Sequence, residues 1–428
     1  MNNKVFPIKN ESACLFKWTW STIFLNRGTT TSCHRGKHWT FDENTIMDFH
    51  NHPGKLEDRK KMLEGVWPGN GCEYCRDIEQ AGGFSDRISQ QTNIRDTPKE
   101  LYHDETAITV TPKILEIYFN NLCNQSCVYC SPGFSSQIEQ EVKRYGPSKF
   151  NFDYSHWPSD SRDQYNTYLS KFWEWMEINH SDLTVFNILG GEPMYQKEFD
   201  MCLDFFDKHP SPNLVWNVFT NMNHAPEKFK EKIQKIQELV DANKIQKMRL
   251  TCSIDCWGEE VEYVRAGFNM EQCEHNMQTL LSTTGIEIAI HATLTALTIP
   301  TLYKLIDKII VWREQRFIEF GWNTVQSPKC FNPYNFGEHL AEYIDLAEQS
   351  FIKKSDKDLS QFQINHDQTH LDILRGIKKQ LLSASVNKIE VNNLVGFLND
   401  LDVRRKQDWK SIFPNIMEIV NKINNADV

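Results

Sequence analysis

Three cysteines stand close together in a segment that follows an apolar, strand-like run. The segment ILEIYFNNLCNQSCVYC contains Cys123, Cys127 and Cys130 in a C-x3-C-x2-C spacing. Three thiolates on one loop can bind three irons of a [4Fe-4S] cluster and leave the fourth iron open, whereas an electron-transfer cluster normally has four cysteines. The alternatives are a zinc site or unreactive thiols, but zinc usually takes four ligands. No fourth Cys or His lies nearby in the sequence.

A second set of cysteines precedes this loop. Cys14, Cys33, Cys72 and Cys75 are widely spaced, and the last two form a C-x2-C pair. Four thiols fit a fully ligated site, either Zn(Cys)4 or a second [4Fe-4S] cluster, and spacing alone does not separate the two. The segment CLFKWTWSTIFLNRGTTTSC around the first two cysteines predicts two short strands joined by a turn at residues 26–28.

Short β-rich runs alternate with helical patterns over residues 114–325, which predicts repeated βα units and a parallel sheet. Apolar residues at helical spacing between the strands predict buried helix faces. The expected strands are Ile114–Phe119, Leu183–Leu189, Leu214–Thr220, Met248–Ile254, Ile286–Leu294 and Phe317–Asn323. The expected buried faces are Phe199, Cys202, Leu203 and Phe206; Phe229, Ile233, Ile236 and Val240; and Leu302, Leu305, Ile306 and Ile309.

Glycines and polar residues follow several of these strands. Ligands of parallel α/β proteins gather at the C-terminal ends of strands. The cysteine loop follows the first strand, and the second strand ends in the segment GGEP, where glycines let a backbone approach a ligand closely. The alternative to ligand binding by GGEP is a tight turn. The alternative to ligand binding by Asp255, which follows the fourth strand, is capping of the next helix.

The cysteine spacing, Tyr129 and the GGEP segment together resemble the radical S-adenosylmethionine (radical SAM) superfamily. The resemblance implies an α/β fold with a partial (β/α)6 TIM-like barrel. It also implies a catalytic [4Fe-4S] cluster, held by the three loop cysteines, whose open iron binds S-adenosyl-L-methionine (SAM). The SAM-binding residues that it implies are Gly190, Gly191, Glu192, Pro193, Asn221, Ser253, Asp255 and Arg265.

Two of these positions leave alternatives. Arg265 matches an Arg that lies near the SAM carboxylate in relatives, but a solvated helix charge is the other interpretation. Met222 follows Asn221 where many relatives have glycine, so the backbone role of this turn is left open. No residue is assigned to the hydrogen-abstraction step.

The N-terminal cysteines and the following segment resemble the Twitch domain, a shortened form of the SPASM module. This resemblance implies a second, auxiliary [4Fe-4S] cluster on Cys14, Cys33, Cys72 and Cys75. Relatives often have Cys-Cys where this chain has Cys33 and His34, and we favour Cys33 because thiolate is the usual iron-sulfur ligand. Zinc is the alternative metal.

The predicted organisation has three parts. Residues 1–105 form a Twitch-like auxiliary iron-sulfur domain, residues 106–334 the radical SAM partial barrel, and residues 335–428 a C-terminal helical region that acts as a lid or packing element. Its expected helices are 339–351, 370–383, 391–401 and 404–423. The long crossover 119–183 is expected to border the substrate cavity, because long loops inside compact domains are usually functional.

The composition is that of a globular protein, with 40% hydrophobic and 24% charged residues among 428. The net charge of -10 argues against general nucleic-acid binding, which needs clustered Lys and Arg. No apolar run approaches the roughly 20 residues that span a bilayer, and the segment MNNKVFPIKN lacks the apolar stretch of a signal peptide. We therefore expect a cytoplasmic protein with no membrane partner.

The leading hypothesis is a radical SAM oxidoreductase or modifying enzyme that cleaves SAM reductively to a 5'-deoxyadenosyl radical, which abstracts hydrogen from a substrate. We favour oxidation or crosslinking of a peptide or protein, with a sugar, aminoglycoside or nucleotide as the alternative small polar substrate. The family implies a flavodoxin- or ferredoxin-type reductant. The hypothesis from another class is a noncatalytic iron-sulfur or zinc scaffold.

Overall fold

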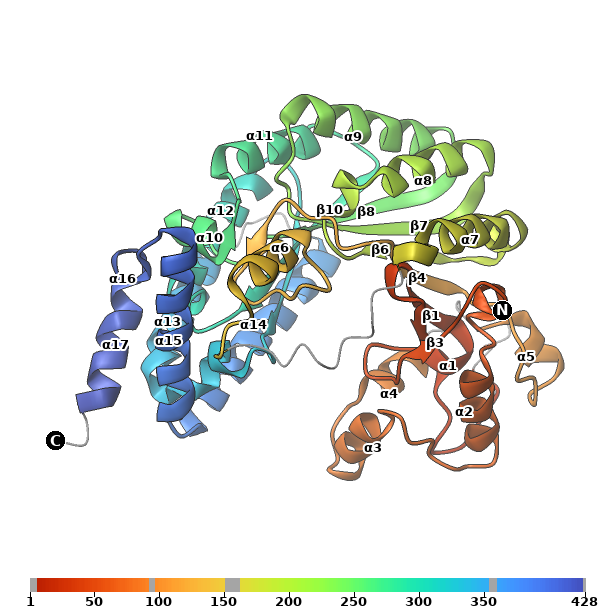
Figure 1. Cartoon of the computed structure of the whole chain (residues 1–428), viewed down its shortest axis with the longest axis horizontal. Helices are drawn as coiled ribbons and strands as arrows, with labels where there is room; N and C mark the ends of the chain where they lie inside the picture. The colour runs from red at the N-terminus through yellow and green to blue at the C-terminus, as the bar shows by residue number, and fades with distance from the viewer. Residues whose placement is uncertain (1–5, 92–96, 151–161, 354–359, 426–428) are drawn as a thin grey trace. The chain divides into compact units, whose positions relative to one another are not determined.

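The computed structural model describes residues 6–91, 97–150, 162–353 and 360–425 (Figure 1). The protein is a mixed α/β structure with a mainly parallel sheet and many helices. The chain forms two compact units. The first unit comprises Met1–Asn121, Pro158–Val218 and Glu238–Met248, and the second comprises Leu122–Trp157, Phe219–Gln237 and Arg249–Val428.

Parallel strands form the centre of the first unit. Strand β4 (Ile114–Tyr118) pairs in parallel with β6 (Val185–Leu189) on one side and with β1 (Trp20–Phe24) on the other, and β6 pairs in parallel with β7 (Ser211–Thr220). The first four residues of β4 are buried. The β-rich runs predicted β4 and β6, in which every residue except Glu116 and Asn187 is apolar or aromatic.

The predicted N-terminal hairpin is confirmed. Strand β1 pairs antiparallel with β2 (Thr29–Thr31), which pairs antiparallel with β3 (Trp39–Thr40). The connection ends at Gly28, whose φ of 59° is a left-handed conformation that glycine adopts without steric cost. Since β1 also pairs with β4, the N-terminal residues extend the sheet, and the three-part domain division remains a prediction.

The second unit contains the other predicted strands. Strand β10 (Ile286–Leu294) has the bounds that the sequence predicts and pairs in parallel with β11 (Glu319–Thr324). Strand β8 (Ile245–Ser253) enters this unit at Arg249. Alternate residues of β10, from Ile286 to Leu294, are buried. All six expected strands are present, whereas their closure into a (β/α)6 barrel remains a prediction.

The predicted buried helix faces are confirmed with one correction. They lie on α8 (Lys197–Lys208), α9 (Pro226–Asp241) and α12 (Leu302–Arg313), and their residues are at most 3% exposed apart from Val240. In α9 the last buried position is Leu239 and not the predicted Val240. Leu239 stands at i+3 from Ile236 and lies on the same helix face. The remaining helices before residue 334 are α1 (Leu15–Thr19), α2 (Pro53–Leu63), α3 (Glu73–Gln80), α4 (Asp86–Gln91), α5 (Lys99–His103), α6 (Ser136–Tyr145), α7 (Tyr165–Asn179), α10 (Glu259–Val264) and α11 (Met270–Leu281).

The C-terminal region is helical, as predicted, but its last predicted helix, 404–423, is wrong. Lys406 ends the preceding helix with a left-handed φ of 56°, and Asp408 caps a separate short helix. Pro414 then starts the final helix, because proline has no backbone N–H to donate and suits a first turn. The helices are α13 (Ala341–Lys353), α14 (Gln361–Ser383), α15 (Lys388–Arg405), α16 (Trp409–Ile412) and α17 (Pro414–Asn425) (Figure 1).

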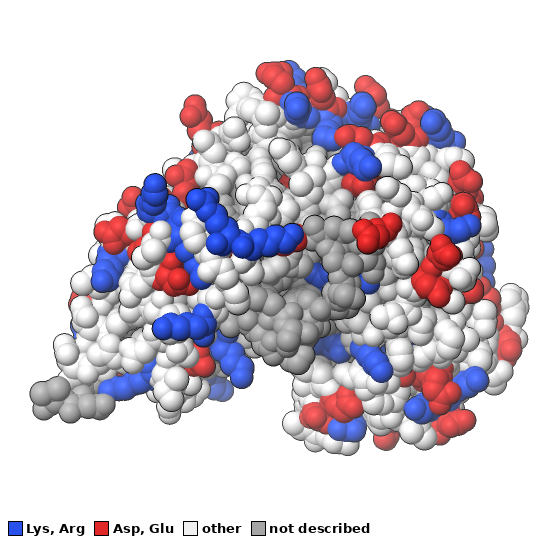
Figure 2. Space-filling model, in the orientation of Figure 1, with Lys and Arg blue, Asp and Glu red and all other residues white. Residues whose placement is uncertain are grey.

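The long crossover 119–183 contains α6 and α7, and its residues 151–161 lie outside the described part of the chain. Among the described helices, none combines the length and apolarity that a bilayer crossing requires. On the face in view, Figure 2 shows acidic and basic side chains interspersed among the described residues. That face therefore presents charges of both signs side by side.

Helix α14 interacts with strand β11 through His366. The backbone N–H of Phe320 donates to His366 Nε2 over 3.1 Å, so this ring nitrogen is an acceptor in the folded protein. Burial, followed by the charges of His370 and Arg313, lowers the pKa of His366 from 6.5 to about 4. The folded state thus holds His366 in its neutral form at neutral pH.

We expect the stability of the wild type to fall as the pH drops from 6.5 towards 4. The unfolded chain binds a proton at this residue in that window, whereas the folded chain does not. His366→Gln keeps an acceptor for Phe320 and removes the titration, so its stability should depend less on pH. Urea unfolding at several pH values measures this, with His103→Gln at an exposed site as the control. Equal pH dependence of His366→Gln and the wild type would contradict the assignment.

Candidate functional site

The cysteine loop is held in place by a short two-stranded sheet. Strand β5 (Ser126–Cys127) pairs antiparallel with β9 (Arg265–Ala266), which sets Cys127 opposite Arg265. Cys123 and Cys127 are buried and Cys130 is half-buried. The backbone N–H of Cys130 donates to Cys127 O over 3.0 Å, so the loop turns tightly between these two cysteines.

The three thiols interact electrostatically. Burial raises the pKa of Cys130, and the neighbouring Cys127 and Cys123 raise it further. Burial also raises the pKa of Cys127, while the charge of Arg265 lowers it. The predicted cysteines are therefore brought close together, and a cation beside them favours their thiolate form.

That cation belongs to a buried ion pair. Arg265 donates from Nε and Nη2 to the two carboxylate oxygens of Asp255 over 2.9 and 2.8 Å, and its Nη1 lies 3.7 Å from Cys127 Sγ. Tyr129 OH and the backbone N–H of Thr293 also donate to Asp255. Four hydrogen bonds thus satisfy a carboxylate that is 0% exposed, as a buried charge requires.

This ion pair rules out the alternative interpretations of Arg265 and Asp255 that the sequence left open. Arg265 is only 7% exposed, so its interpretation as a solvated helix charge is wrong. Asp255 does not cap the next helix, because the N-cap of α10 is Gly258. Ser253 is half-buried at the end of β8. Contacts of these residues with SAM remain predictions.

The turn after β7 adopts a left-handed backbone conformation that glycine usually takes. Met222 has a φ of 60° and is fully buried, and Asn276 Nδ2 donates to its carbonyl over 3.0 Å. Asn221 donates to Asn124 Oδ1 over 2.7 Å, and its Nδ2 lies 4.0 Å from Cys123 Sγ. Such strained residues often occur at functional sites, and this one places Asn221 against the cysteine loop.

The GGEP segment forms a turn with two left-handed glycines. Gly190 and Gly191 have φ values of 88° and 59°. A Cβ on Gly190 would lie 2.6 Å from the Tyr118 side chain, so this position has no room for another residue. Glu192 is 1% exposed and accepts a hydrogen bond from Met194 N over 3.2 Å, next to Pro193. The geometry explains the residue types, and SAM binding by this turn stays a prediction.

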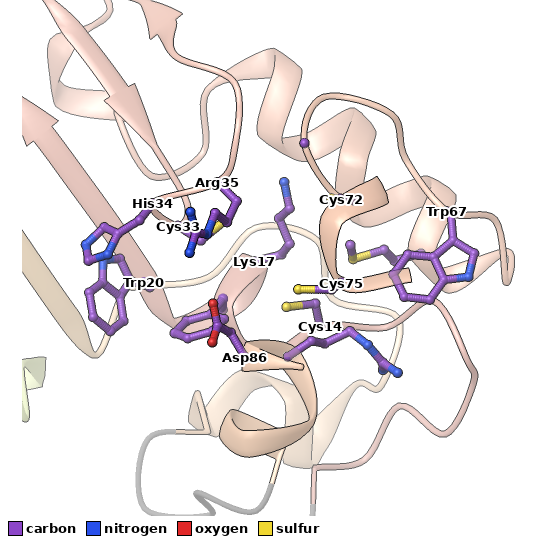
Figure 3. Close-up of a pocket in the computed structure, with 14 residues that line it drawn as sticks. Cys14, Lys17, Trp20, Cys33, His34, Arg35, Trp67, Cys72, Cys75 and Asp86 are labelled. Atoms are coloured by element: carbon purple, nitrogen blue, oxygen red, sulfur yellow. The ribbon is translucent and has the colours of Figure 1, made fainter. Parts of the chain in front are cut away.

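The N-terminal cysteines line one cavity of about 70 Å³, shown in Figure 3. Cys14 precedes α1, Cys33 follows β2, Cys72 precedes α3, and Cys75 lies within α3. One water needs roughly 10–15 Å³ of such volume, so this cavity is several times larger. The four residues that the sequence selects are thus brought together from three separate segments.

Buried thiols dominate the chemistry of this four-cysteine cavity. Burial and the neighbouring Cys33 raise the pKa of Cys14 to about 12, and burial raises that of Cys72 to about 11. Gly71 approaches the opposite wall so closely that a Cβ would lie 1.9 Å from Arg35 O. Only glycine fits the turn that positions Cys72.

His34 lines the cavity but is held by another residue. Its Nε2 lies 2.8 Å from Glu116 Oε1, and this hydrogen bond raises the pKa of His34. This contact occupies Nε2 and leaves Nδ1 without it, so the choice of Cys33 over His34 as the ligand remains a prediction.

Helix α2 contributes residues that sequence analysis missed. Its buried residues Lys55, Asp58, Arg59 and Met62 are spaced i, i+3, i+4 and i+7, but three of them are charged. Lys17, which lines the four-cysteine cavity, pairs with Asp58 over 2.7 Å. The spacing of these charged residues at i, i+3 and i+4 could have indicated a buried helix face. A search for apolar residues at helical spacing does not detect such a face.

The C-terminal helices support the helix that follows the cysteine loop. Arg405 at the end of α15 pairs with Glu141 of α6 over 2.8 Å, and Arg404 donates to Gly146 O over 2.8 Å. At the other end of α6, Ser136 Oγ accepts from Cys123 N over 3.1 Å. The end of α15 thus helps to position α6, and α6 contacts the loop.

Buried donors without partners test whether the two cysteine sites suit iron-sulfur clusters. Among the described residues, Gln125 Nε2 and Ser131 Oγ beside the loop cysteines, and Ser32 Oγ beside Cys33, are buried and lack a hydrogen-bond partner. Such groups usually have a partner, and cluster or thiolate sulfur accepts hydrogen bonds. The donor sets therefore fit clusters. Within the same described ranges, no three His, Cys, Asp or Glu side chains form a group that could hold a single metal ion.

Comparisons with known proteins give little guidance. No family model and no curated protein sequence matches the chain. Among solved structures, the chain is similar to one described as "Structure of TYW1 with a lysine-pyruvate adduct bound", with 18% identity and a TM-score of 0.30, over 59% of this chain and 74% of that chain. A likeness this low supports no conclusion about function.

We expect Arg265→Met to destabilise the protein by about 3–5 kcal/mol, because it leaves the buried Asp255 charge without its partner. Urea unfolding measures the change. The control is Arg249→Met, which removes a half-exposed pair with Glu319 and should cost about 0–1 kcal/mol. Similar losses in both variants would contradict a special role for the buried pair.

Proposed function

We propose that the protein is a radical SAM enzyme whose catalytic [4Fe-4S] cluster is held by Cys123, Cys127 and Cys130. When bound and reduced, the cluster would supply an electron for the reductive cleavage of SAM to a 5'-deoxyadenosyl radical, which abstracts hydrogen from the substrate. The observation that supports this most is the group of three interacting thiols beside a buried cation and two unpartnered donors. Three thiolates leave one iron open.

The residues proposed for SAM have distinct tasks. The glycines of the GGEP turn leave backbone groups accessible for the amino group of SAM, while Asn221 and Ser253 offer polar side chains at strand ends. Asp255 and Arg265 already bond each other. We assign that pair first to positioning Cys127, with the remaining Arg265 Nη1 free of Asp255 and adjacent to the thiol.

The four-cysteine cavity would hold an auxiliary [4Fe-4S] cluster as the core of a Twitch-like domain, with zinc as the alternative. Its lining includes four thiols and the buried Lys17 ammonium. Both cations and hydrogen-bond donors offset the negative charge of a thiolate-ligated centre. The auxiliary site would accept or relay an electron from a reaction on the substrate.

The substrate class is the least constrained part of the proposal. We favour a peptide or protein that undergoes oxidation or crosslinking, and a flavodoxin- or ferredoxin-type protein as the electron donor. A sugar, aminoglycoside or nucleotide is the alternative substrate. The competing class is a noncatalytic scaffold, which would need neither a glycine turn at a strand end nor a cluster with an open iron.

We expect anaerobically reconstituted protein to produce 5'-deoxyadenosine from SAM and dithionite, and Cys127→Ala to abolish this product. Iron analysis should fall from about eight to about four atoms per chain, because two cubanes become one. The control is Cys202→Ala, since Cys202 is a buried core residue of α8, and it should retain both product and iron. Product formation by Cys127→Ala would refute the catalytic assignment, and one cubane plus zinc in the wild type would refute the auxiliary cluster.

A further inference from the structure

A buried ion pair forms part of the four-cysteine cavity. Lys17 Nζ lies 2.7 Å from Asp58 Oδ2, and the two side chains are 4% and 2% exposed. Lys17 lies on α1, one turn after Cys14, and lines the cavity together with all four cysteines. Figure 3 shows its side chain between the labelled Cys33 and Cys72.

Neighbouring groups hold both members of the pair in place. Arg59 Nε donates to the Lys17 carbonyl over 2.7 Å, and Asn70 Nδ2 lies 3.4 Å from Asp58 Oδ1. Asn70 begins the turn that leads through Gly71 to Cys72. The pair is thus fixed between the helix that follows Cys14 and the turn before Cys72, so its charges cannot move away from the cavity.

We propose that the Lys17–Asp58 pair sets the reduction potential of the auxiliary cluster. The inference rests on the proposed function, because it requires a redox-active cluster in the four-cysteine cavity. One-electron reduction makes a thiolate-ligated cluster more negative, and a fixed cation nearby stabilises that reduced form. The low dielectric of a buried site strengthens this effect, and Asp58 limits it by partly neutralising Lys17.

The two members of the pair should therefore act in opposite directions. Lys17→Met removes the cation and lowers the midpoint potential. Asp58→Asn leaves the ammonium less neutralised and raises it. We expect each change to alter the reduced-to-oxidised ratio at a fixed potential by about tenfold, equivalent to about 59 mV for one electron. The double variant removes both charges and should lie between the two.

The experiment is a redox titration of the reconstituted full-length chain, followed by electron paramagnetic resonance. A background with Cys123, Cys127 and Cys130 all changed to Ala leaves the four-cysteine site as the proposed cluster site. Lys60→Met is the matched control, because Lys60 is exposed on the same helix as Asp58. Its potential should equal that of the parent.

Opposite shifts in the two single variants support the proposal. Unchanged potentials, or shifts of the same sign, overturn it. If Lys17→Met does not fold because Asp58 is left unpaired, the Asp58→Asn and double variants still decide the sign. Failure of the proposed function is recognised separately, because the background protein would then contain no iron-sulfur cluster or would contain zinc.

Discussion

Burial opposes the thiolate form that a metal centre needs, and a buried cation beside the thiols is the interaction that offsets this opposition. Burial raises the pKa of cysteines in both candidate sites, while metal ligation requires the deprotonated sulfur. Each site has a cation whose charge lowers a thiol pKa, Arg265 beside Cys127 and Lys17 beside Cys14. A buried cation in turn needs an anion, so each is paired with a carboxylate, Asp255 or Asp58.

Sequence pattern predicted the elements whose burial follows chemical type. Strand β10 was predicted to the residue, because its alternate positions from Ile286 to Leu294 are apolar and buried. The hairpin was predicted from Gly28, whose left-handed backbone is specific to a tight connection. The four N-terminal cysteines were predicted as one site, and they line one cavity. For the strand and the hairpin, local chemistry restricts the structure, whereas the fold brings the four cysteines together from three segments.

The pattern failed where a polar residue is buried by tertiary contacts. Asp58 on α2 is charged, so hydropathy assigns it to the surface, and only its pairing with Lys17, 41 positions away, makes its burial stable. Arg265 was open to interpretation as a solvated charge for the same reason. The predicted helix over 404–423 was wrong for a different reason. The helical pattern was given more weight than Pro414, whose missing N–H interrupts helical hydrogen bonding.

The C-terminal helices show how a region without candidate ligands contributes to a site. Tyr263 at the end of α10 donates to Asp402 over 2.8 Å, and Asp402 also accepts from the Trp409 backbone. These bonds fix the end of α15, from which Arg405 reaches Glu141 of α6. Since α10 leads directly into β9 and α6 contacts the cysteine loop, the same few residues support both strands of the small sheet that holds Cys127. The end of α15 therefore supports the geometry of the cysteine loop.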